Sequence, residues 1–407
     1  MSATLPLAGL TVLDVSSFIA APVAATVMGD YGADVIKVEP PNGGDPNRTL
    51  GTIASYPKSS VNYSWEMDSR GKRSIALDLT TEAGQGVLYR LAAKADVFIT
   101  NYPLAVRGKL KIGAEIIRPL SARMIYVSFT GYGESGPDMH LPGFDSTAFF
   151  ARSGLLDCNR YEGQPPGVAM PGQGDRVSGM TLFGAIMLAL YRRERTGEGD
   201  LITSSLYANG LWSNGVGAQA ALLGAFLPPR PPHERPRNAV TNIYRTKDDR
   251  WIQLTIVIED RHWPLLADLI GRSDLKSDPR FAETAVRRQN ATALAEILSP
   301  IFERETYPTW RDRLLSKGIP HGLIGRLQDL PDDPQAVAAG AVVATANAVM
   351  PRGLAAPFAL ASSPVPPHRA APALGADSQA VLKQAGYSAK EIAALTKSGA
   401  VGAKAGT

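Results

Sequence analysis

The sequence has few of the side chains that commonly act as nucleophiles or metal ligands. Its 407 residues include one cysteine, Cys158, and five histidines. A single cysteine forms no disulfide within the chain and excludes a zinc site built from several cysteines. The histidines form no H-x-x-x-H pair and lie beside no carboxylate motif, so the sequence predicts no metal site. We therefore look first to the carboxylates for chemistry.

The sequence also lacks strong charge and long apolar runs. Its formal net charge is +4, and no run of four or more basic residues occurs, which argues against nucleic-acid binding. No run approaches the roughly 18 apolar residues of a membrane span. The N-terminal residues lack the basic and apolar regions of a signal peptide. We expect a cytoplasmic protein that binds neither nucleic acid nor a membrane.

Two nucleotide-binding fingerprints are absent as well. The chain has no G-x-x-x-x-G-K-[ST] loop for a nucleotide phosphate. In the first turn, "SSFIAAP", Phe18 and Ile19 stand where the glycines of G-x-G-x-x-G let the backbone approach a pyrophosphate. Glu39 ends the next apolar run, where a ribose-binding acid would lie. Without the glycines, we expect no nicotinamide cofactor.

Short β-branched runs alternate with helical patterns over the first half of the chain. Helical stretches such as "PVAATVMGDYG" and "TEAGQGVLYRLAAKA" separate the runs. Such alternation predicts an α/β fold with a parallel sheet covered by helices. The predicted strands cover residues 10–16, 33–39, 72–79, 96–102, 124–133 and 200–206.

A change of composition divides the chain. The stretch "LPPRPPHERPR" at 227–237 is basic and proline-rich, as in a stiff connector. We expect a large domain whose first part is 1–205, a linker at 206–237, a small α+β domain at 238–325, and a return segment at 326–407. The small domain would contain a hairpin that turns near Asp248 and Asp249. Helical patterns follow it at 260–271, 290–304 and 307–317.

Asp175 is the carboxylate with the most informative surroundings. In "PGQGDRVSGM" it follows two glycines and precedes a helical pattern of apolar residues. Aspartate commonly caps helices at such places, and residue type and position alone favour a cap. The same position also suits a nucleophile, because helix amides stabilise an anion. Gly172 and Gly174 leave room for a substrate, and their amides could face an oxyanion. The residues alone leave both interpretations open.

Several segments, in order along nearly the whole chain, resemble the class III coenzyme A transferases. This group contains formyl-CoA transferase and carnitine CoA-transferase, and the α-methylacyl-CoA racemases share its fold. The similar segments include "LAGLTVLDVSSFIAAPVAATVMGDYGADVIKVEPPNGGD", "GKRSIALDL", "ADVFITNY", "YVSFTGYGESGP", "GFDSTAFFARSG", "GDRVSGM", "RRERTGEG", "YRTKDDRWIQL", "SDPRF" and "APALGADSQAVLKQAGYS". Their shared order makes the resemblance specific. It implies a Rossmann-like large domain built from both chain ends, an inserted smaller α+β domain, and a homodimer of interlocked subunits.

The resemblance also implies a mechanism. In the transferases the nucleophile is the aspartate of a "GD" motif that opens a helix, which here is Asp175 after Gly174. Its carboxylate would attack an acyl-CoA thioester and form an acyl anhydride, then an aspartyl-CoA thioester. From this intermediate, coenzyme A would pass to an acceptor acid without ATP or a metal.

The segment "GFD" separates the chain from the racemases, which carry a histidine before this aspartate. Phe144 takes the place of the histidine and cannot move a proton, so we expect no racemase or isomerase activity. Asp145 matches an acidic position near the transferase site, and a helix-capping role is an equal alternative. A catalytically silent protein that binds CoA thioesters is the remaining alternative.

The resemblance further implies contacts to coenzyme A. They come from the first strand–helix turn and from the ends of two later strands, at Ser17, Phe18, Ala20, Leu77, Asn101 and Tyr102. Lys109 best matches a cation that follows, and Arg107 is a near alternative. Arg73 is a candidate phosphate contact, although an exposed charge at a strand edge is the safer interpretation.

Some positions depart from formyl-CoA transferase. Ile19 replaces a glutamine beside the nucleophile, Pro40 an arginine and Thr80 a lysine, and a "GGGG" loop is absent. These differences argue against oxalate or formate as substrates. With Phe144, the apolar Ile19 favours a larger or less polar acid, such as a four- or five-carbon dicarboxylate or a branched acid. The connector offers three candidates for holding a second carboxylate, namely Arg230, Arg235 and Arg237. The favoured interpretation is that they are solvated charges of a linker.

Overall fold

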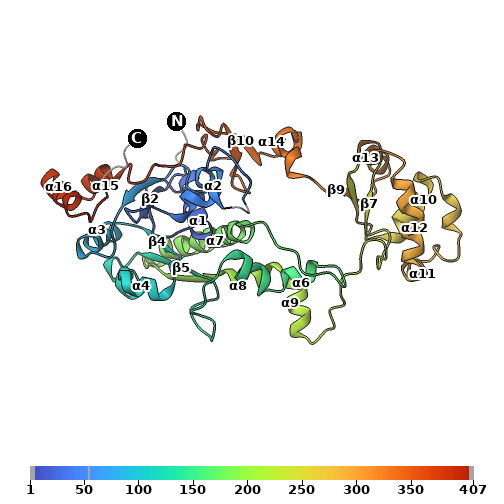
Figure 1. Ribbon diagram of the computed structural model, residues 1–407, viewed down its shortest axis with the longest axis horizontal. Coiled ribbons are helices and arrows are strands. Elements are labelled where there is room, and N and C mark those ends of the chain that lie inside the picture. The colour runs from blue at the N-terminus through green and yellow to red at the C-terminus, as the bar shows by residue number, and fades with distance from the viewer. Residues whose placement is uncertain (1–4, 54–55, 403–407) are drawn as a thin grey trace. The chain divides into compact units, whose positions relative to one another are not determined.

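The six strands predicted from the alternating pattern form one sheet in the computed structural model, which describes residues 5–53 and 56–402 (Figure 1). Neighbouring strands are all parallel, in the order β3-β2-β1-β4-β5-β6. They are β1 (Thr11–Asp14), β2 (Asp34–Glu39), β3 (Arg73–Ala76), β4 (Val97–Thr100), β5 (Ile125–Thr130) and β6 (Leu201–Ser205). This is the order of doubly wound folds, in which the progression reverses between β1 and β4. The predicted α/β class is confirmed.

Helices cover both faces of this sheet. Successive side chains of a strand point to opposite faces, so Val12 of β1 enters one core cluster and Leu13 the other. The Val12 cluster packs under α1 (Ala20–Asp30) and α7 (Gln173–Thr196), and the Leu13 cluster under α3 (Glu82–Ala92). Shorter helical elements beside the sheet are η1 (Pro46–Thr52), α2 (Tyr63–Asp68), α4 (Leu104–Leu110), α5 (Ala114–Ile117), η2 (Arg118–Leu120), the π-helix η3 (Asp145–Ala151) and α6 (Leu155–Asn159).

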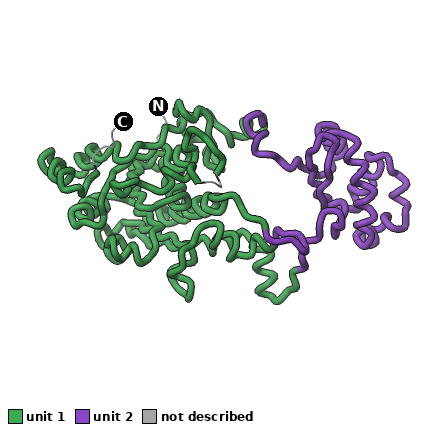
Figure 2. Tube along the Cα trace, in the orientation of Figure 1, with its two compact units in different colours: residues 1–157, 167–227, 334–407 green, residues 158–166, 228–333 purple. Residues whose placement is uncertain are grey.

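The chain separates into two units (Figure 2). Unit 1 comprises residues 1–157, 167–227 and 334–407, and unit 2 comprises residues 158–166 and 228–333. Part of the segment predicted as a linker is helical, because it forms α8 (Leu206–Ser213) and α9 (Gly215–Leu222). The Ser205 side chain caps α8 by accepting a hydrogen bond from the Ala208 amide at 3.1 Å. The proline-rich stretch 227–237 forms no helix.

Unit 2 contains a three-stranded antiparallel sheet and its own core. The predicted hairpin is β7 (Ile243–Arg245) and β8 (Trp251–Leu254), and Asp249 in its turn has a φ of 56°. The third strand, β9 (His321–Leu323), is too short for a sequence pattern to reveal. The helical elements of unit 2 are α10 (Glu259–Leu269), η4 (Ser273–Lys276), α11 (Thr284–Gln289), α12 (Ala291–Phe302), α13 (Tyr307–Ser316) and η5 (Leu327–Asp332).

The C-terminal segment returns to the sheet of unit 1. The Asp377 amide donates to the Ser74 carbonyl, and the Asp377 carboxylate accepts from the Ser74 amide, both at 2.9 Å. Val381 and Leu382 are buried in the same core cluster as Leu13. The elements of this segment are α14 (Pro334–Ala338), β10 (Val342–Ala344), β11 (Arg352–Leu354), α15 (Ser378–Gln384) and α16 (Ala389–Lys397). Within residues 5–53 and 56–402, no helix combines the length and apolarity that crossing a membrane requires.

A buried group of charges lies at the carboxyl end of β1. Asp14 pairs with Lys37 at 3.4 Å and with Lys72 at 2.8 Å, and Lys37 also pairs with Asp45 at 2.7 Å. Burial by itself would raise the pKa of Asp14, but the two ammonium groups outweigh it and hold that pKa below its ordinary value. The group therefore ties β1 to β2, to the loop after β2 and to the residue before β3.

The Asp14→Asn substitution would leave two buried ammonium groups without their shared counter-ion. Removing one partner of a buried ion pair costs about 3–5 kcal/mol, so we expect a large fall in the urea midpoint of unfolding. The matched control is Asp34→Asn, whose carboxylate pairs with Arg73 at a partly exposed place on the same sheet. Exposed pairs contribute about 0–1 kcal/mol. Unfolding of both variants in urea is measured by circular dichroism. An equal fall of the urea midpoint in the two variants would contradict the structural role of the buried group.

Candidate active site

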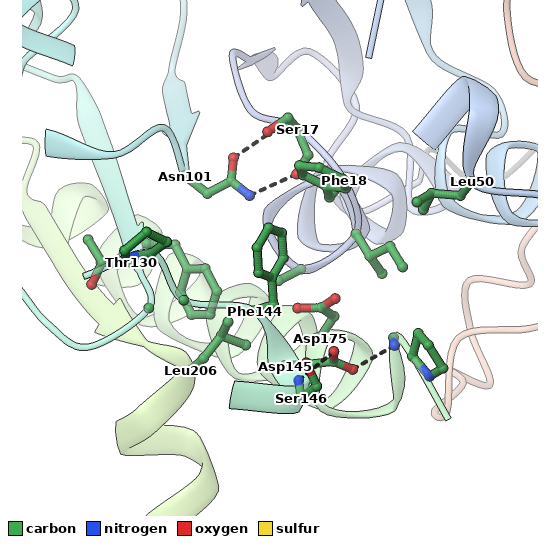
Figure 3. Close-up of a pocket in the computed structure, with 18 of the residues that line it drawn as sticks. Ser17, Phe18, Leu50, Asn101, Thr130, Phe144, Asp145, Ser146, Asp175 and Leu206 are labelled. Atoms are coloured by element: carbon green, nitrogen blue, oxygen red, sulfur yellow. Dashed lines mark hydrogen bonds between the residues drawn. The ribbon is translucent and has the colours of Figure 1, made fainter. Parts of the chain in front are cut away.

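A cavity opens at the carboxyl ends of β1 and β4. Doubly wound sheets bind ligands at this edge, where the strand order reverses. The cavity has a volume of about 460 Å³ (Figure 3). Its lining includes eight of the site residues predicted from the sequence, namely Ser17, Phe18, Ile19, Ala20, Asn101, Phe144, Asp145 and Asp175. The structure therefore brings together four stretches that are far apart in the sequence.

Asp175 does not cap the helix that it was predicted to open. Helix α7 begins at Gln173, its N-cap is Gly172 with a φ of 85°, and Asp175 is the third helical residue. The carboxylate of Asp145 holds this helix start, because its Oδ2 accepts a hydrogen bond from the Gly172 amide at 2.6 Å. Its Oδ1 accepts from the Ser146 amide of its own helix, η3, at 2.7 Å. The capping interpretation of Asp175 is wrong. Its carboxylate faces the cavity instead (Figure 3).

Gly172 and Gly174 permit close packing at the start of α7. A Cβ atom at Gly174 would lie 2.5 Å from Cγ of Phe149, and one at Gly172 would lie 2.9 Å from Cδ1 of Ile19. The expected space for a substrate at these glycines is therefore filled by the protein. The Gly172 amide donates to Asp145, so the expectation that it faces an oxyanion does not hold in this structure.

The charges around Asp175 oppose one another. Burial is the main cause that raises the pKa of Asp175 to about 7, and the Asp145 carboxylate adds to the rise. The Arg176 guanidinium opposes it. Arg176 is held in place by Asp68, with Nη2 and Oδ2 2.9 Å apart, and Arg176 Nη1 donates to the Gly172 carbonyl at 3.2 Å. At pH 7 Asp175 is about half ionised.

The turn between β1 and α1 has a strained backbone at Phe18. Its φ of 61° lies in the left-handed region, which costs a residue with a side chain about 1–3 kcal/mol. Asp45 Oδ1 accepts from the Phe18 amide at 2.9 Å, and Asn47 Nδ2 donates to the Phe18 carbonyl at 3.1 Å. The Asn101 side chain exchanges two hydrogen bonds with the Ser17 backbone, at 2.8 and 2.7 Å. These bonds hold the turn in its strained shape.

Four of the predicted coenzyme A contacts are not among the residues that line the cavity, namely Arg73, Leu77, Tyr102 and Lys109. Arg73 begins β3 and pairs with Asp34, which begins β2, so both lie at the amino edge of the sheet, opposite the cavity. The alternative interpretation of Arg73 as a strand-edge charge fits this place. The Leu77 side chain is buried in the core, and its backbone forms a β-bridge with Val401.

The predicted cations of the site also have other surroundings. Arg107 is buried, and its guanidinium donates to the carbonyls of Tyr102 at 2.6 Å and Phe129 at 2.9 Å. Lys109 is exposed on α4 and is not among the cavity residues. Tyr102 is half-buried against the Leu13 core cluster.

The arginines of the connector belong to unit 2. There Arg230 lies over the ring of Tyr161 at 5.3 Å, and Arg237 donates to the Pro228 carbonyl at 2.9 Å. Arg235 is exposed.

Sequence reasoning missed the residues behind the cavity. Asp45 ends "PPNGGD", where two glycines precede an aspartate as they do near Asp175, so the same signal could have found it. Asp68 and Arg176 are 108 residues apart, and no local pattern links them. Tyr56 lines the cavity for the same tertiary reason. Within the described part of the chain, no group of three or more His, Cys, Asp or Glu side chains could hold a metal ion.

Comparisons with known proteins agree with this architecture. The model of the CoA-transferase family III matches residues 7–378. The cinnamoyl-CoA:phenyllactate CoA-transferase of Clostridium sporogenes is 30% identical over 398 residues, which cover 96% of this chain and 95% of that protein. The (R)-2-hydroxy-4-methylpentanoate CoA-transferase of Clostridioides difficile is 31% identical over 330 residues, covering 81% and 82%.

A solved structure shows the same fold. A CaiB/BaiF family protein from Brucella suis superposes with a TM-score of 0.82 at 27% identity, over 94% of this chain and all of that one. The resemblance predicted from the sequence segments is confirmed. Because the family model spans most of the chain and a relative at 30% identity covers nearly all of it, the chain belongs to the CoA-transferase family III and is a CoA-transferase.

Proposed function

We propose that the protein moves coenzyme A from an acyl-CoA thioester to a carboxylic acid, with Asp175 as the covalent nucleophile. The observation that carries this proposal is the place of the Asp175 carboxylate. It lies in the first turn of α7 and faces the cavity, and no described residue donates a hydrogen bond to it. The other carboxylate of the cavity, Asp145, has both oxygens engaged by backbone amides.

The transfer proceeds in four balanced steps. An oxygen of Asp175 attacks the thioester carbonyl, the C–S bond breaks, and CoA leaves as a thiolate while an acyl anhydride forms. The thiolate attacks the aspartyl carbonyl, which releases the donor acid and leaves an aspartyl-CoA thioester. The acceptor carboxylate attacks this thioester and frees the thiolate again. The thiolate then attacks the acceptor carbonyl, which gives the new acyl-CoA and restores Asp175.

The surroundings of Asp175 suit this role. A carboxylate with a pKa of about 7 is more basic, and so more nucleophilic, than an ordinary aspartate, yet about half of it is ionised at neutral pH. Its place in the first turn of α7 adds a favourable interaction with the helix dipole. Arg176 Nη1 and Ile19 Cδ1 both lie within 3 Å of the place that a Cβ atom of Gly172 would take. The Arg176 guanidinium favours the charged form of Asp175.

The acceptor classes predicted from the sequence are a four- or five-carbon dicarboxylate and a branched acid. The C. difficile relative is named for a branched hydroxy acid, which supports the second class. Phe144 lines the cavity beside Asp145 and cannot transfer a proton, which argues against a racemase. The contacts to coenzyme A from the β1–α1 turn and Asn101 are part of this proposal, as is a cytoplasmic location.

The Asp175→Asn substitution tests the nucleophile. It removes the attacking oxygen while keeping the shape of the side chain, so we expect CoA transfer to fall by roughly 10³-fold or more. In the wild-type protein, incubation with acetyl-CoA and then hydroxylamine should leave a hydroxamate on the Asp175 peptide, detected by mass spectrometry. The control is Glu194→Gln, which changes an exposed carboxylate near the other end of α7 and should keep both activity and adduct. Turnover by Asp175→Asn near the wild-type value would refute the mechanism, and binding without any adduct would favour a silent binding protein.

The pH dependence follows from the groups around Asp175, which are Asp145, Asp68, Arg176 and Tyr56. Only ionised Asp175 attacks, so kcat/KM should rise about tenfold per pH unit below pH 7 and level off above it. Arg176 lowers the pKa of Asp175, so Arg176→Met should move the rise to higher pH. Steady-state rates between pH 5 and 9 would show this.

The control for this shift is Arg73→Met, which removes an arginine at the opposite edge of the sheet. Its pH profile should match that of the wild type. An Arg176→Met profile with an unchanged midpoint would show that the guanidinium does not act on Asp175.

We also propose the domain arrangement and the homodimer that the sequence resemblance implies. Unit 1 contains both chain ends, which supports an inserted unit 2. Large apolar side chains on and after α8 are 79–91% exposed, namely Trp212, Val216, Leu222, Leu223 and Phe226. Extended apolar surface is uncommon on a monomer and supports coverage by a second subunit. Light scattering should give twice the chain mass of 43.3 kDa, and a monomer would refute the interlocked dimer.

A further inference from the structure

Two carboxylates are the only charged side chains among the described residues that line the cavity. The other large side chains of the wall are apolar or aromatic, namely Phe18, Ile19, Leu50, Ile53, Tyr56, Phe129, Phe144 and Leu206. The second carboxylate of a dicarboxylic acid would meet no Lys, Arg or His on this wall, and it would face the like charge of Asp145. Because a desolvated charge without a partner is costly, the wall disfavours such a group.

Two aromatic rings of this wall contact each other. The ring centroids of Phe18 and Phe144 are 5.7 Å apart and their planes are nearly perpendicular, at 89°. Figure 3 shows the Phe144 ring between the Phe18 turn and the Asp175 carboxylate. The Phe144 side chain is 53% exposed, so much of its surface can accept a ligand. A further ring packs favourably against such a pair, because aromatic rings attract one another in edge-to-face and offset-stacked arrangements.

The strained backbone of Phe18 supports a role for its ring in ligand binding. Left-handed residues with side chains are uncommon, persist where the surrounding structure fixes them, and cluster at ligand sites. At Phe18 the amide and the carbonyl are both held, by Asp45 and Asn47. A glycine would adopt this φ without strain, but it would not place a ring against Phe144.

We propose that Phe18 and Phe144 form an aromatic clamp that selects monocarboxylic acyl groups with a flat or branched apolar chain. This inference rests on the proposed transfer at Asp175 and names the substrate class of that site. The clamp holds the apolar chain beside the reacting carbonyl, and Ile19 and Leu206 complete the apolar wall. Of the two acceptor classes predicted from the sequence, the clamp accepts the branched acid and disfavours the dicarboxylate.

The first test compares acceptor acids with acetyl-CoA as the donor. The acids are 3-phenylpropanoate, 4-methylpentanoate, glutarate and ¹³C-labelled acetate, and each product is quantified by mass spectrometry. The label gives the product of acetate a different mass from the donor. We expect kcat/KM for the two apolar acids to exceed that for glutarate by about tenfold or more. A preference for glutarate would overturn the clamp while leaving the transfer mechanism intact.

The second test removes one ring. Because Phe144 is half exposed, Phe144→Ala should fold normally and lower kcat/KM for 3-phenylpropanoate about tenfold, with a change under about threefold for acetate. Phe144→Tyr keeps the ring and should restore the wild-type selectivity. The control Tyr191→Ala removes an exposed ring on α7, away from the cavity lining, and should change kcat/KM for neither acid. Equal losses for 3-phenylpropanoate and acetate in Phe144→Ala would refute the clamp.

A binding measurement separates failure of the clamp from failure of the proposed function. If the wild-type protein transfers CoA to no acid and forms no hydroxamate, the transfer proposal fails. The affinity of Asp175→Asn for 3-phenylpropanoyl-CoA and for glutaryl-CoA still tests the clamp, because no chemistry is needed. We expect about tenfold tighter binding of 3-phenylpropanoyl-CoA, lost in the double variant with Phe144→Ala. Equal affinities would overturn the clamp.

Discussion

The site depends on the ion pairs that Asp14 forms with Lys37 and Lys72 inside the protein. A carboxylate and two ammonium groups are stable there only because each neutralises another, so their positions are tightly constrained. Lys37 also pairs with Oδ2 of Asp45 and so fixes the position of that carboxylate. The other oxygen of Asp45 accepts a hydrogen bond from the Phe18 amide. A contact in the core thus determines the shape of a turn at the cavity, and the strain at Phe18 is offset by bonds to a buried network.

At the start of α7, Asp145 forms the hydrogen bond to the helix start that Asp175 would otherwise be expected to form. Helix starts need acceptors for their amides, and an aspartate at that place would ordinarily be used as a cap. Here the carboxylate of Asp145 comes from η3 to hold the start, so Asp175 is not required for it. Burial then raises the pKa of Asp175, whereas the Arg176 guanidinium limits the rise. The balance leaves a basic carboxylate that is still partly ionised at neutral pH.

One backbone fold is compatible with different acid substrates, because the backbone positions the carboxylate and other side chains line the cavity. The sheet order, the β1–α1 turn and the start of α7 bring a carboxylate to the edge where the strand order reverses. In the proposed clamp, the side chains on the wall select the acyl groups. Relatives at about 30% identity are named for different acids, which agrees with this separation. In this chain the wall side chains include Ile19 and Phe144, both apolar.

Local sequence patterns predict the six parallel strands, the hairpin of unit 2, and Asp175 as the candidate nucleophile. These features depend on patterns among neighbouring residues, which apolar periodicity and glycines reveal. The folded chain is needed to see that Asp145 holds α7, that Arg107 is buried, and that Arg73 lies at the opposite edge from the cavity. The contacts that decide such roles join residues 22 to 108 positions apart, as in Arg107–Phe129 and Asp68–Arg176. Which strand ends and helix ends meet is a property of the whole fold, so no local pattern could reveal it.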